Sequence, residues 1–132
     1  MLVVDASIAV EYLLRTPTGM AIAPLLDDAD LMAPELLDAE VLAVLRREVQ
    51  RGALAVDRAA EALEDLGRWS VERVAHRPLL DVAWALRDRV SAYDALYVAA
   101  AALHGATLVT ADGALARAPA LPVAVHVVRR PM

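Results

Sequence analysis

The stretch SAYDALYVAAAALHGATLVTAD, residues 91–112, indicates which fold the chain adopts. Its first part predicts a helix over 91–104 that is apolar on almost every side. Ser91 is placed to cap the helix, and Asp94 lies near the positive end of its dipole. Residues 107–109 then form a short apolar strand. A helix that leads directly into a buried strand is typical of a parallel sheet covered by helices.

The rest of the chain repeats this alternation of short apolar strands and amphipathic helices, and no two strands are placed as a hairpin. The expected strands cover 2–4, 31–33, 71–75, 107–109 and 123–128. The expected helices cover 7–14, 20–28, 35–51, 57–66, 78–89, 91–104 and 112–117. We therefore expect an α/β fold with a small parallel sheet of four to five strands, flanked by helices on both faces. We expect one domain over residues 1–132.

The apolar content is high for a short chain, at 59 % of 132 residues, with a mean hydropathy of +0.46. The longest uncharged stretch, 95–111, is interrupted by His104 and Gly105, so a membrane span is not expected. The first residues carry no basic cluster, which argues against a signal peptide. We expect a cytoplasmic protein that buries its extra apolar surface in a homodimer and does not bind membranes.

The charged residues exclude several kinds of chemistry. The chain has no cysteine, so disulfides and thiolate metal sites are absent, and all 13 basic residues are arginines, so no mechanism can use a lysine. The net charge of −5 has the wrong sign for a nucleic-acid binder. That objection disappears if the acids are concentrated in a metal site and the arginines lie around it.

Four acids are placed to meet at one edge of the predicted sheet. Asp5 and Asp112 each follow an apolar strand, and ligands of such sheets bind beyond the carboxyl ends of the strands. Asp94 lies in the first turn of a helix that runs back along the sheet. Glu40, in PELLDAEVLAVLRR, borders the buried stripe of its helix. The alternative interpretation is that the three aspartates only cap helices and that Glu40 is solvated.

Four converging carboxylates would repel one another and raise one another's pKa. A divalent hard cation, Mg²⁺ or Mn²⁺, removes this conflict because it prefers oxygen ligands and retains water molecules that can serve as nucleophile. The sequence therefore predicts a metal site at this edge.

Three motifs in this order, VVDASIAV, PELLDAEVLAVLRR and SAYDALYVAAAALHGATLVTAD, resemble the PIN-domain nucleases, and most closely the VapC toxins of bacterial toxin–antitoxin pairs. The resemblance covers essentially the whole chain. It implies a PIN-like fold and a Mg²⁺- or Mn²⁺-dependent endoribonuclease that cleaves RNA and inhibits growth when free of its antitoxin. It also implies a VapB-type antitoxin as partner, with DNA contacted only through that antitoxin.

The acidic positions of the family correspond to Asp5, Glu40, Asp94 and Asp112, which the resemblance makes both metal ligands and catalytic residues. Ser7 and Thr110 match supporting family positions near the metal, although Ser7 could equally cap the first helix. The segment 113–116 offers no further ligand, which leaves the number of ions open.

The arginines are candidates for RNA contact. Arg47 and Arg51 lie within roughly 20° of Glu40 around its helix, so a row of cations leads away from the acid. Arg87 and Arg89 precede the Asp94 helix and could contribute similarly. The alternative for Arg47 and Arg51 is a solvated helix end. The histidines are expected to be structural, and the tryptophans and tyrosines to serve the core or a dimer interface.

Other function classes fit less well. A phosphate-receiver domain needs a lysine, and the aspartyl phosphatases need Asp-x-Asp after the first strand, where this chain has Asp5-Ala6-Ser7. Two alternatives remain open: a PIN-domain ribonuclease of RNA processing without an antitoxin, and an inactive PIN-like dimeric scaffold.

Overall fold

The computed structural model describes residues 1–129. Its strands are β1 (Leu2–Val4), β2 (Leu31–Pro34), β3 (Val71–Val74), β4 (Thr107–Thr110) and β5 (Val125–Val127). The helices between them are α1 (Ala6–Leu14), α2 (Pro17–Asp27), α3 (Leu36–Gln50), α4 (Val56–Arg68), the 3₁₀ turn η1 (Arg77–Leu79), α5 (Leu80–Ala85), α6 (Ala92–His104) and α7 (Gly113–Arg117).

The strands form one parallel sheet in the order β3-β2-β1-β4-β5, which confirms the predicted α/β class. The central strand β1 pairs with β2 on one side and with β4 on the other. The strands β1, β2 and β4 are almost entirely buried, whereas the edge strands β3 and β5 are partly exposed. Apolar central strands of this kind require helices on both faces of the sheet.

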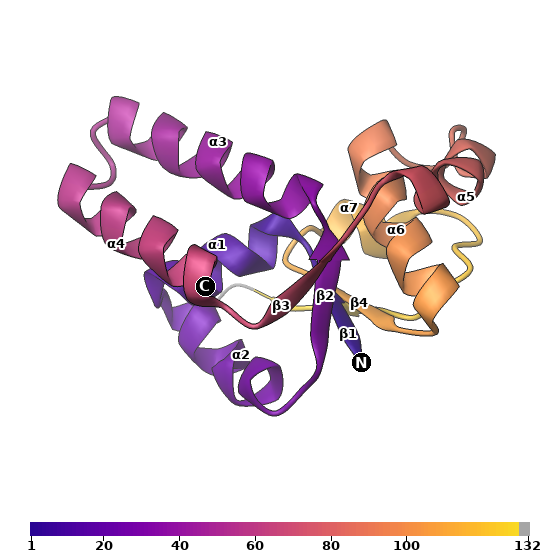
Figure 1. Cartoon of the computed structure of the whole chain (residues 1–132), viewed down its shortest axis with the longest axis horizontal. Helices are drawn as coiled ribbons and strands as arrows, with labels where there is room; N and C mark the ends of the chain where they lie inside the picture. Colours follow the sequence, from indigo (N-terminus) through magenta and orange to yellow (C-terminus); the bar gives the residue numbers. More distant parts are fainter. Residues whose placement is uncertain (130–132) are drawn as a thin grey trace.

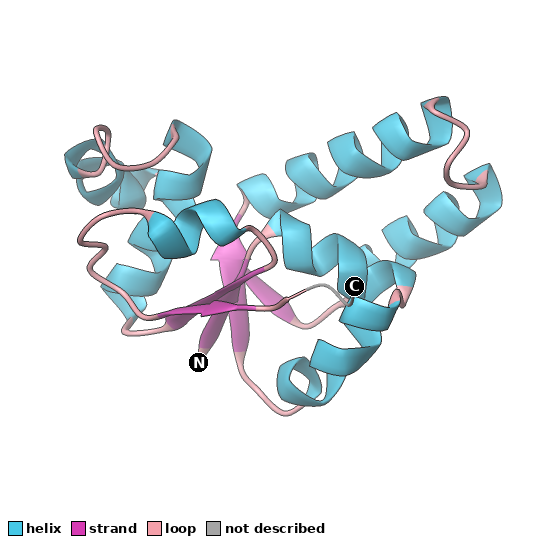
Figure 2. Ribbon diagram, turned by 180° about the vertical axis from the view of Figure 1, so that it is seen from behind, coloured by secondary structure: helices cyan, strands magenta, loops and turns pink. Residues whose placement is uncertain are grey.

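Figures 1 and 2 show the two groups of helices, α1 to α4 on one side of the sheet and α5 to α7 on the other. The helices α3 and α4 form a long antiparallel pair that extends beyond the sheet (Figure 1). The helix α6 packs against β1, β2 and β4. Its buried residues are Ala95, Tyr97, Val98, Ala99, Ala100 and Ala101. Small alanines bring α6 close to the sheet, so its polar residues are placed with little freedom.

The helices α1 and α2 pack especially closely at Gly19. A Cβ atom at this position would lie 1.9 Å from the carbonyl oxygen of Glu11 and 2.9 Å from the Cα of Tyr12. Both atoms belong to the backbone of α1, which cannot rotate away. Only glycine therefore allows the two helices to adopt this separation.

Two predicted features of α4 are wrong. The helix is capped by Ala55, so Asp57 lies inside its first turn and does not serve as N-cap. Gly67 also does not close the helix, which continues to Arg68. At this end of the helix the carbonyl oxygen of Leu66 accepts two hydrogen bonds, from the amide of Trp69 at 3.3 Å and from Arg73 of β3 at 2.7 Å.

The predicted helix over 78–89 is shorter in the structure, because α5 ends at Ala85. The amide of Leu86 donates to the carbonyl oxygen of Ala83 at 3.1 Å, a tightened turn that ends regular helix geometry. Leu86 is buried, so the chain is anchored there before it turns to start α6. The last strand, β5, is likewise shorter than the predicted 123–128.

One of the three histidines has a structural contact, as predicted for this residue type. The Nε2 atom of His76 accepts a hydrogen bond at 3.0 Å from the amide of Leu36, the first residue of α3. Glu35, the N-cap residue, makes no side-chain capping bond, so His76 supplies the cap from a distant part of the chain. Among residues 1–129, no helix combines the length and apolar character needed to span a lipid bilayer.

Candidate active site

Two of the predicted acids lie at the carboxyl ends of the neighbouring strands β1 and β4. Asp5 follows β1, and its amide donates to the carbonyl oxygen of Val109 in β4. Asp112 follows β4 after one intervening residue. Both aspartates also cap helices, since Asp5 accepts from the amide of Ile8 at 3.1 Å and Asp112 from that of Ala114 at 2.8 Å. Both aspartates therefore cap helices, and both lie at the predicted edge of the sheet; whether they also bind a metal stays a prediction.

Two hydroxyl groups fix the buried carboxylate of Asp5. Ser7 donates to its Oδ1 atom at 2.6 Å, and Thr110 donates to its Oδ2 atom. The same hydroxyl oxygens accept the backbone amides of Ala111 and Asp112, each at 2.9 Å. Ser7 therefore does not cap α1, as one interpretation had it, but joins the ends of β1 and β4 together with Thr110.

Asp94 lies in the first turn of α6, where the amide of Asp94 donates to the Oγ atom of the N-cap Ser91 at 3.3 Å. Burial raises the pKa of Asp94 above its ordinary value; the hydrogen bond of Ser91 opposes this, and the charge of Asp112 adds to it. Burial likewise raises the pKa of Asp5. The hydrogen bonds of Ser7, Thr110 and the backbone lower this pKa, and the charge of Asp94 raises it further. The three aspartates therefore interact electrostatically.

Glu40 joins this group through a tyrosine. The hydroxyl of Tyr97 in α6 donates to the Oε1 atom of Glu40 in α3 at 2.7 Å. Burial raises the pKa of Tyr97, and the hydrogen bond to Glu40 and the charges of Glu40, Asp5 and Asp94 raise it further. One buried hydroxyl thus contacts one predicted acid, Glu40, and lies within the electrostatic influence of two more, Asp5 and Asp94. Sequence reasoning assigned Tyr97 to the core or an interface; its spacing of three residues from Asp94 was the available signal.

The residue types at this edge fit a divalent cation. Carboxylate oxygens are the ligands that Mg²⁺ and Mn²⁺ prefer. The ion pairs of the described residues involve other acids, namely Arg51–Glu48, Arg58–Glu61 and Arg73–Asp38. Within residues 1–129, however, no three acidic or histidine side chains are grouped tightly enough, as they stand, to hold one ion together. Binding therefore requires side-chain rotation, for which exposed Asp112 has room.

Comparison with protein families gives a match over residues 2–121 to the PIN domain. The chain belongs to the PIN-domain family. Ribonuclease VapC1 of Mycobacterium tuberculosis is 40 % identical to this PIN domain over 129 residues, which cover 96 % of this chain and 97 % of that protein.

Two solved structures share the fold of this PIN domain. PAE2754 from Pyrobaculum aerophilum superposes with a TM-score of 0.71 at 23 % identity, over 94 % of this chain and 82 % of that one. VapBC2 from Rickettsia felis, crystallised with a DNA fragment from its promoter, superposes with a TM-score of 0.64 at 17 % identity. That match covers 96 % of this chain and 97 % of the other. These likenesses confirm the predicted fold.

The four candidate RNA-binding arginines of this PIN domain are all exposed. Arg47 lies in the last turn of α3, and Arg51 follows the helix and pairs with Glu48 at 3.1 Å. The guanidinium of Arg87 lies 5.0 Å from the ring centre of Trp84, and Arg89 donates to the carbonyl oxygen of Ala120 at 2.8 Å. In the described part of the chain, none of the four is paired with a candidate metal ligand.

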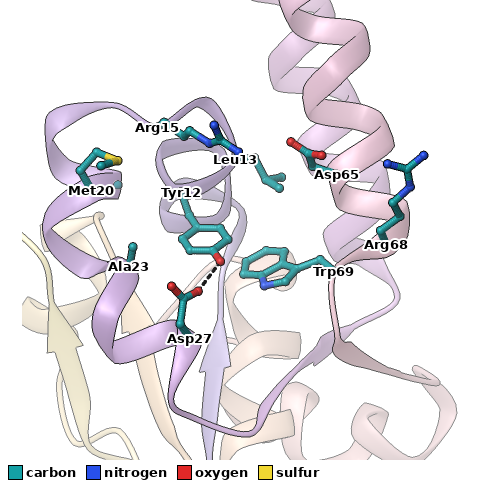
Figure 3. A pocket seen from close by; sticks show the side chains of 10 residues that line it. Tyr12, Leu13, Arg15, Met20, Ala23, Asp27, Asp65, Arg68 and Trp69 are labelled. Carbon is teal, nitrogen blue, oxygen red and sulfur yellow. Dashed lines mark hydrogen bonds between the residues drawn. The ribbon is translucent and has the colours of Figure 1, made fainter.

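A well-formed pocket lies away from the acids. It has a volume of about 480 Å³ between α1, α2 and the end of α4 (Figure 3). Its floor is the stacked pair Tyr12 and Trp69, whose ring centres are 4.8 Å apart, and Tyr12 donates to Asp27 at 2.5 Å. Burial and the hydrogen bond to Asp27 raise the pKa of Tyr12 to about 12. None of the four candidate ligands lines this pocket, so its size does not make it the active site.

Proposed function

We propose that this chain, as one PIN domain over residues 1–132, is a Mg²⁺- or Mn²⁺-dependent endoribonuclease and the toxin of a toxin–antitoxin pair. The observation that carries the proposal is the set of carboxylates at the strand ends, which among residues 1–129 have no arginine partner: the Tyr97 hydroxyl donates to Glu40, and the charges of Asp5 and Asp94 act on the same hydroxyl. The family match and a relative named ribonuclease support the activity.

Asp5, Glu40, Asp94 and Asp112 would hold the cation. When bound, a divalent cation supplies positive charge that activates water and stabilises the leaving oxygen of a phosphodiester. Asp5 has the most fixed carboxylate of the four, because Ser7 and Thr110 hold its two oxygens. Its Oδ1 atom also accepts the amide of Ile8, so Oδ2 is the oxygen that can accept a further contact.

The exposed arginines would orient the RNA chain. Arg47 and Arg51 extend in a row from Glu40 along α3, and their guanidinium groups can contact successive phosphates without reading the bases. Arg87 and Arg89 lie just before α6, whose first turn carries Asp94, and are proposed to bind another part of the substrate. The net charge of −5 makes such local positive rows necessary for RNA binding.

Cleavage of RNA is expected to require Mg²⁺ or Mn²⁺ and to stop with EDTA, because no described basic residue is paired with the candidate ligands. Water as nucleophile leaves 5′-phosphate and 3′-hydroxyl ends. The measurement is end-group analysis of a labelled single-stranded RNA. Products with a 2′,3′-cyclic phosphate would mean that the 2′-hydroxyl of the RNA attacks, which contradicts the mechanism. A chain that cleaves no RNA with either cation would be the inactive scaffold.

A VapB-type antitoxin is the proposed partner, and DNA is proposed to be contacted only through it. The fold resembles that of VapBC2, which was crystallised with promoter DNA. An antitoxin arginine placed among the four carboxylates would neutralise them and exclude the cation. The test is the neighbouring gene: a small adjacent reading frame that encodes a DNA-binding protein would support this partner. Its absence favours the ribonuclease of RNA processing.

We also propose a homodimer through the surface of α5 and α6. Four large apolar side chains on these helices are between 50 and 69 % exposed: Leu80, Trp84, Tyr93 and Leu103. The helices α5 and α6 pack against each other, and exposed apolar groups on such a pair of helices are typical of an interface.

Light scattering is expected to show a dimer at micromolar concentration and a monomer for Leu103→Glu, because the new charge would be buried without a partner. Leu42→Glu is the matched control, since Leu42 on α3 is 52 % exposed against 50 % for Leu103. The control should remain dimeric. A monomeric wild-type chain contradicts the proposal.

A further inference from the structure

The helix α6 carries two polar groups toward the candidate site, one turn apart. Asp94 lies in the first turn, and Tyr97 follows three residues later on the same side of the helix. The neighbours of Tyr97 in this helix, Val98 to Ala101, are buried and apolar. Tyr97 itself is 1 % exposed, so its hydroxyl depends on a protein partner.

That partner is the carboxylate of Glu40, at 2.7 Å from the hydroxyl oxygen to Oε1. Because α3 and α6 cover opposite faces of the sheet (Figures 1 and 2), this hydrogen bond crosses the edge at which the strands end. Half-buried Glu40 has no ion pair among the described residues. The Tyr97 hydroxyl is therefore the group that fixes the direction of this carboxylate.

We propose that Tyr97 is a positioning residue, whose hydroxyl holds Oε1 of Glu40 so that Oε2 is presented to the cation. The inference rests on the proposed metal site. A neutral donor suits this task, because it orients the carboxylate without removing the negative charge that the cation needs. An arginine or lysine at the same place would compete with the metal. Groups that orient metal ligands in this way commonly contribute to metal affinity.

The alternative is a purely structural role, in which Glu40 only satisfies a buried phenol. The two roles differ in what Tyr97→Phe changes. The phenylalanine ring fills the same space, so the structural role predicts a changed melting temperature and an unchanged metal affinity. The positioning role predicts weaker metal binding, and it predicts this even if the melting temperature does not change.

The test is the dissociation constant for Mn²⁺, measured by electron paramagnetic resonance of the free ion with the full-length protein. Tyr97→Phe is expected to bind Mn²⁺ about 10-fold more weakly than the wild-type chain. Tyr12→Phe is the matched control. It removes another hydroxyl that donates to a carboxylate, Asp27 at 2.5 Å, in a pocket that none of the proposed ligands lines. The control should bind Mn²⁺ as tightly as the wild type.

A double-mutant cycle with Glu40→Asp tests whether Tyr97→Phe weakens Mn²⁺ binding through Glu40. The comparison is of Mn²⁺ affinities and does not depend on the stability of any one variant. Shortening the side chain withdraws the carboxylate from the Tyr97 hydroxyl. If Tyr97 acts through Glu40, the double variant should bind Mn²⁺ no more weakly than Glu40→Asp alone. Unchanged affinity in Tyr97→Phe, or two losses that add in full, would overturn the positioning role. A wild-type chain that binds no Mn²⁺ would overturn the metal site as well.

Discussion

Replacing Asp94 with asparagine is expected to reduce RNA cleavage by about 100-fold or more. Changes to groups that merely orient metal ligands cost about 10–100-fold, so loss of a ligand charge should cost at least as much. Asparagine keeps the shape of the side chain and can still accept a hydrogen bond at the start of α6. The measurement is RNA cleavage in Mn²⁺, compared with the wild type at equal concentration.

The same variant should be as stable as the wild type, or more stable, when melted in EDTA. Burial and the charge of Asp112 raise the pKa of Asp94, so its ionised form is unfavourable in the folded protein. For an acid with a raised folded pKa, this cost is absent below the unfolded value of 3.8 and grows as the pH rises toward the folded pKa. The gain in melting temperature should therefore increase with pH above about 4 and then level off.

Ser91→Ala is the control for the capping role of this segment. It removes the acceptor of the Asp94 amide, which should cost about 1 kcal/mol of stability while most of the activity remains. An Asp94→Asn protein that melts early in EDTA and still cleaves RNA at the wild-type rate would show that Asp94 is only part of a helix cap.

Gly19→Ala is expected to destabilise the protein by about 2 kcal/mol or more, because the new methyl group would overlap the backbone of α1. The two helices would have to separate, and neither contacting atom belongs to a side chain that can rotate. The measurement is the free energy of unfolding in urea.

Gly67→Ala is the matched control, since Gly67 also lies within a helix but has no atom within 4 Å of the place that a methyl group would occupy. It should stabilise the protein by about 0.5–1 kcal/mol, because alanine loses less backbone entropy than glycine in a helix. If Gly19→Ala were as stable as Gly67→Ala, the close packing of α1 and α2 would not limit the choice of residue.

The sequence was informative wherever a local pattern decides the structure. An apolar run followed by aspartate predicted both the end of a strand and the place of an acid, as for Asp5 and Asp112. Asp94 was placed correctly in the first turn of α6 because Ser91 signals the helix start. Whether these acids are ligands stays a prediction.

Features that depend on tertiary contacts could not be predicted from the sequence in the same way. Tyr97 meets Glu40 only because two helices from opposite faces of the sheet approach each other at its edge. Ser7 was expected near the metal or as a cap. It does not cap α1, and its hydroxyl joins Asp5 to the backbone that follows β4, a long-range contact that the sequence does not reveal. The early end of α5 reflects the burial of Leu86, which no local propensity predicts.

The central position of β1 has a consequence for how the chain is made. β1 is synthesised before β2 and β3, and its neighbour β4 only after them, yet the sheet order places β1 and β4 side by side. A growing chain that has not yet reached residue 107 holds Asp5 beside an open strand edge, and it lacks Asp112 and the Thr110 hydroxyl. Asp5 and Asp112 are thus brought together only after β4 has been made and has paired with β1, so the complete set of acids forms late in folding.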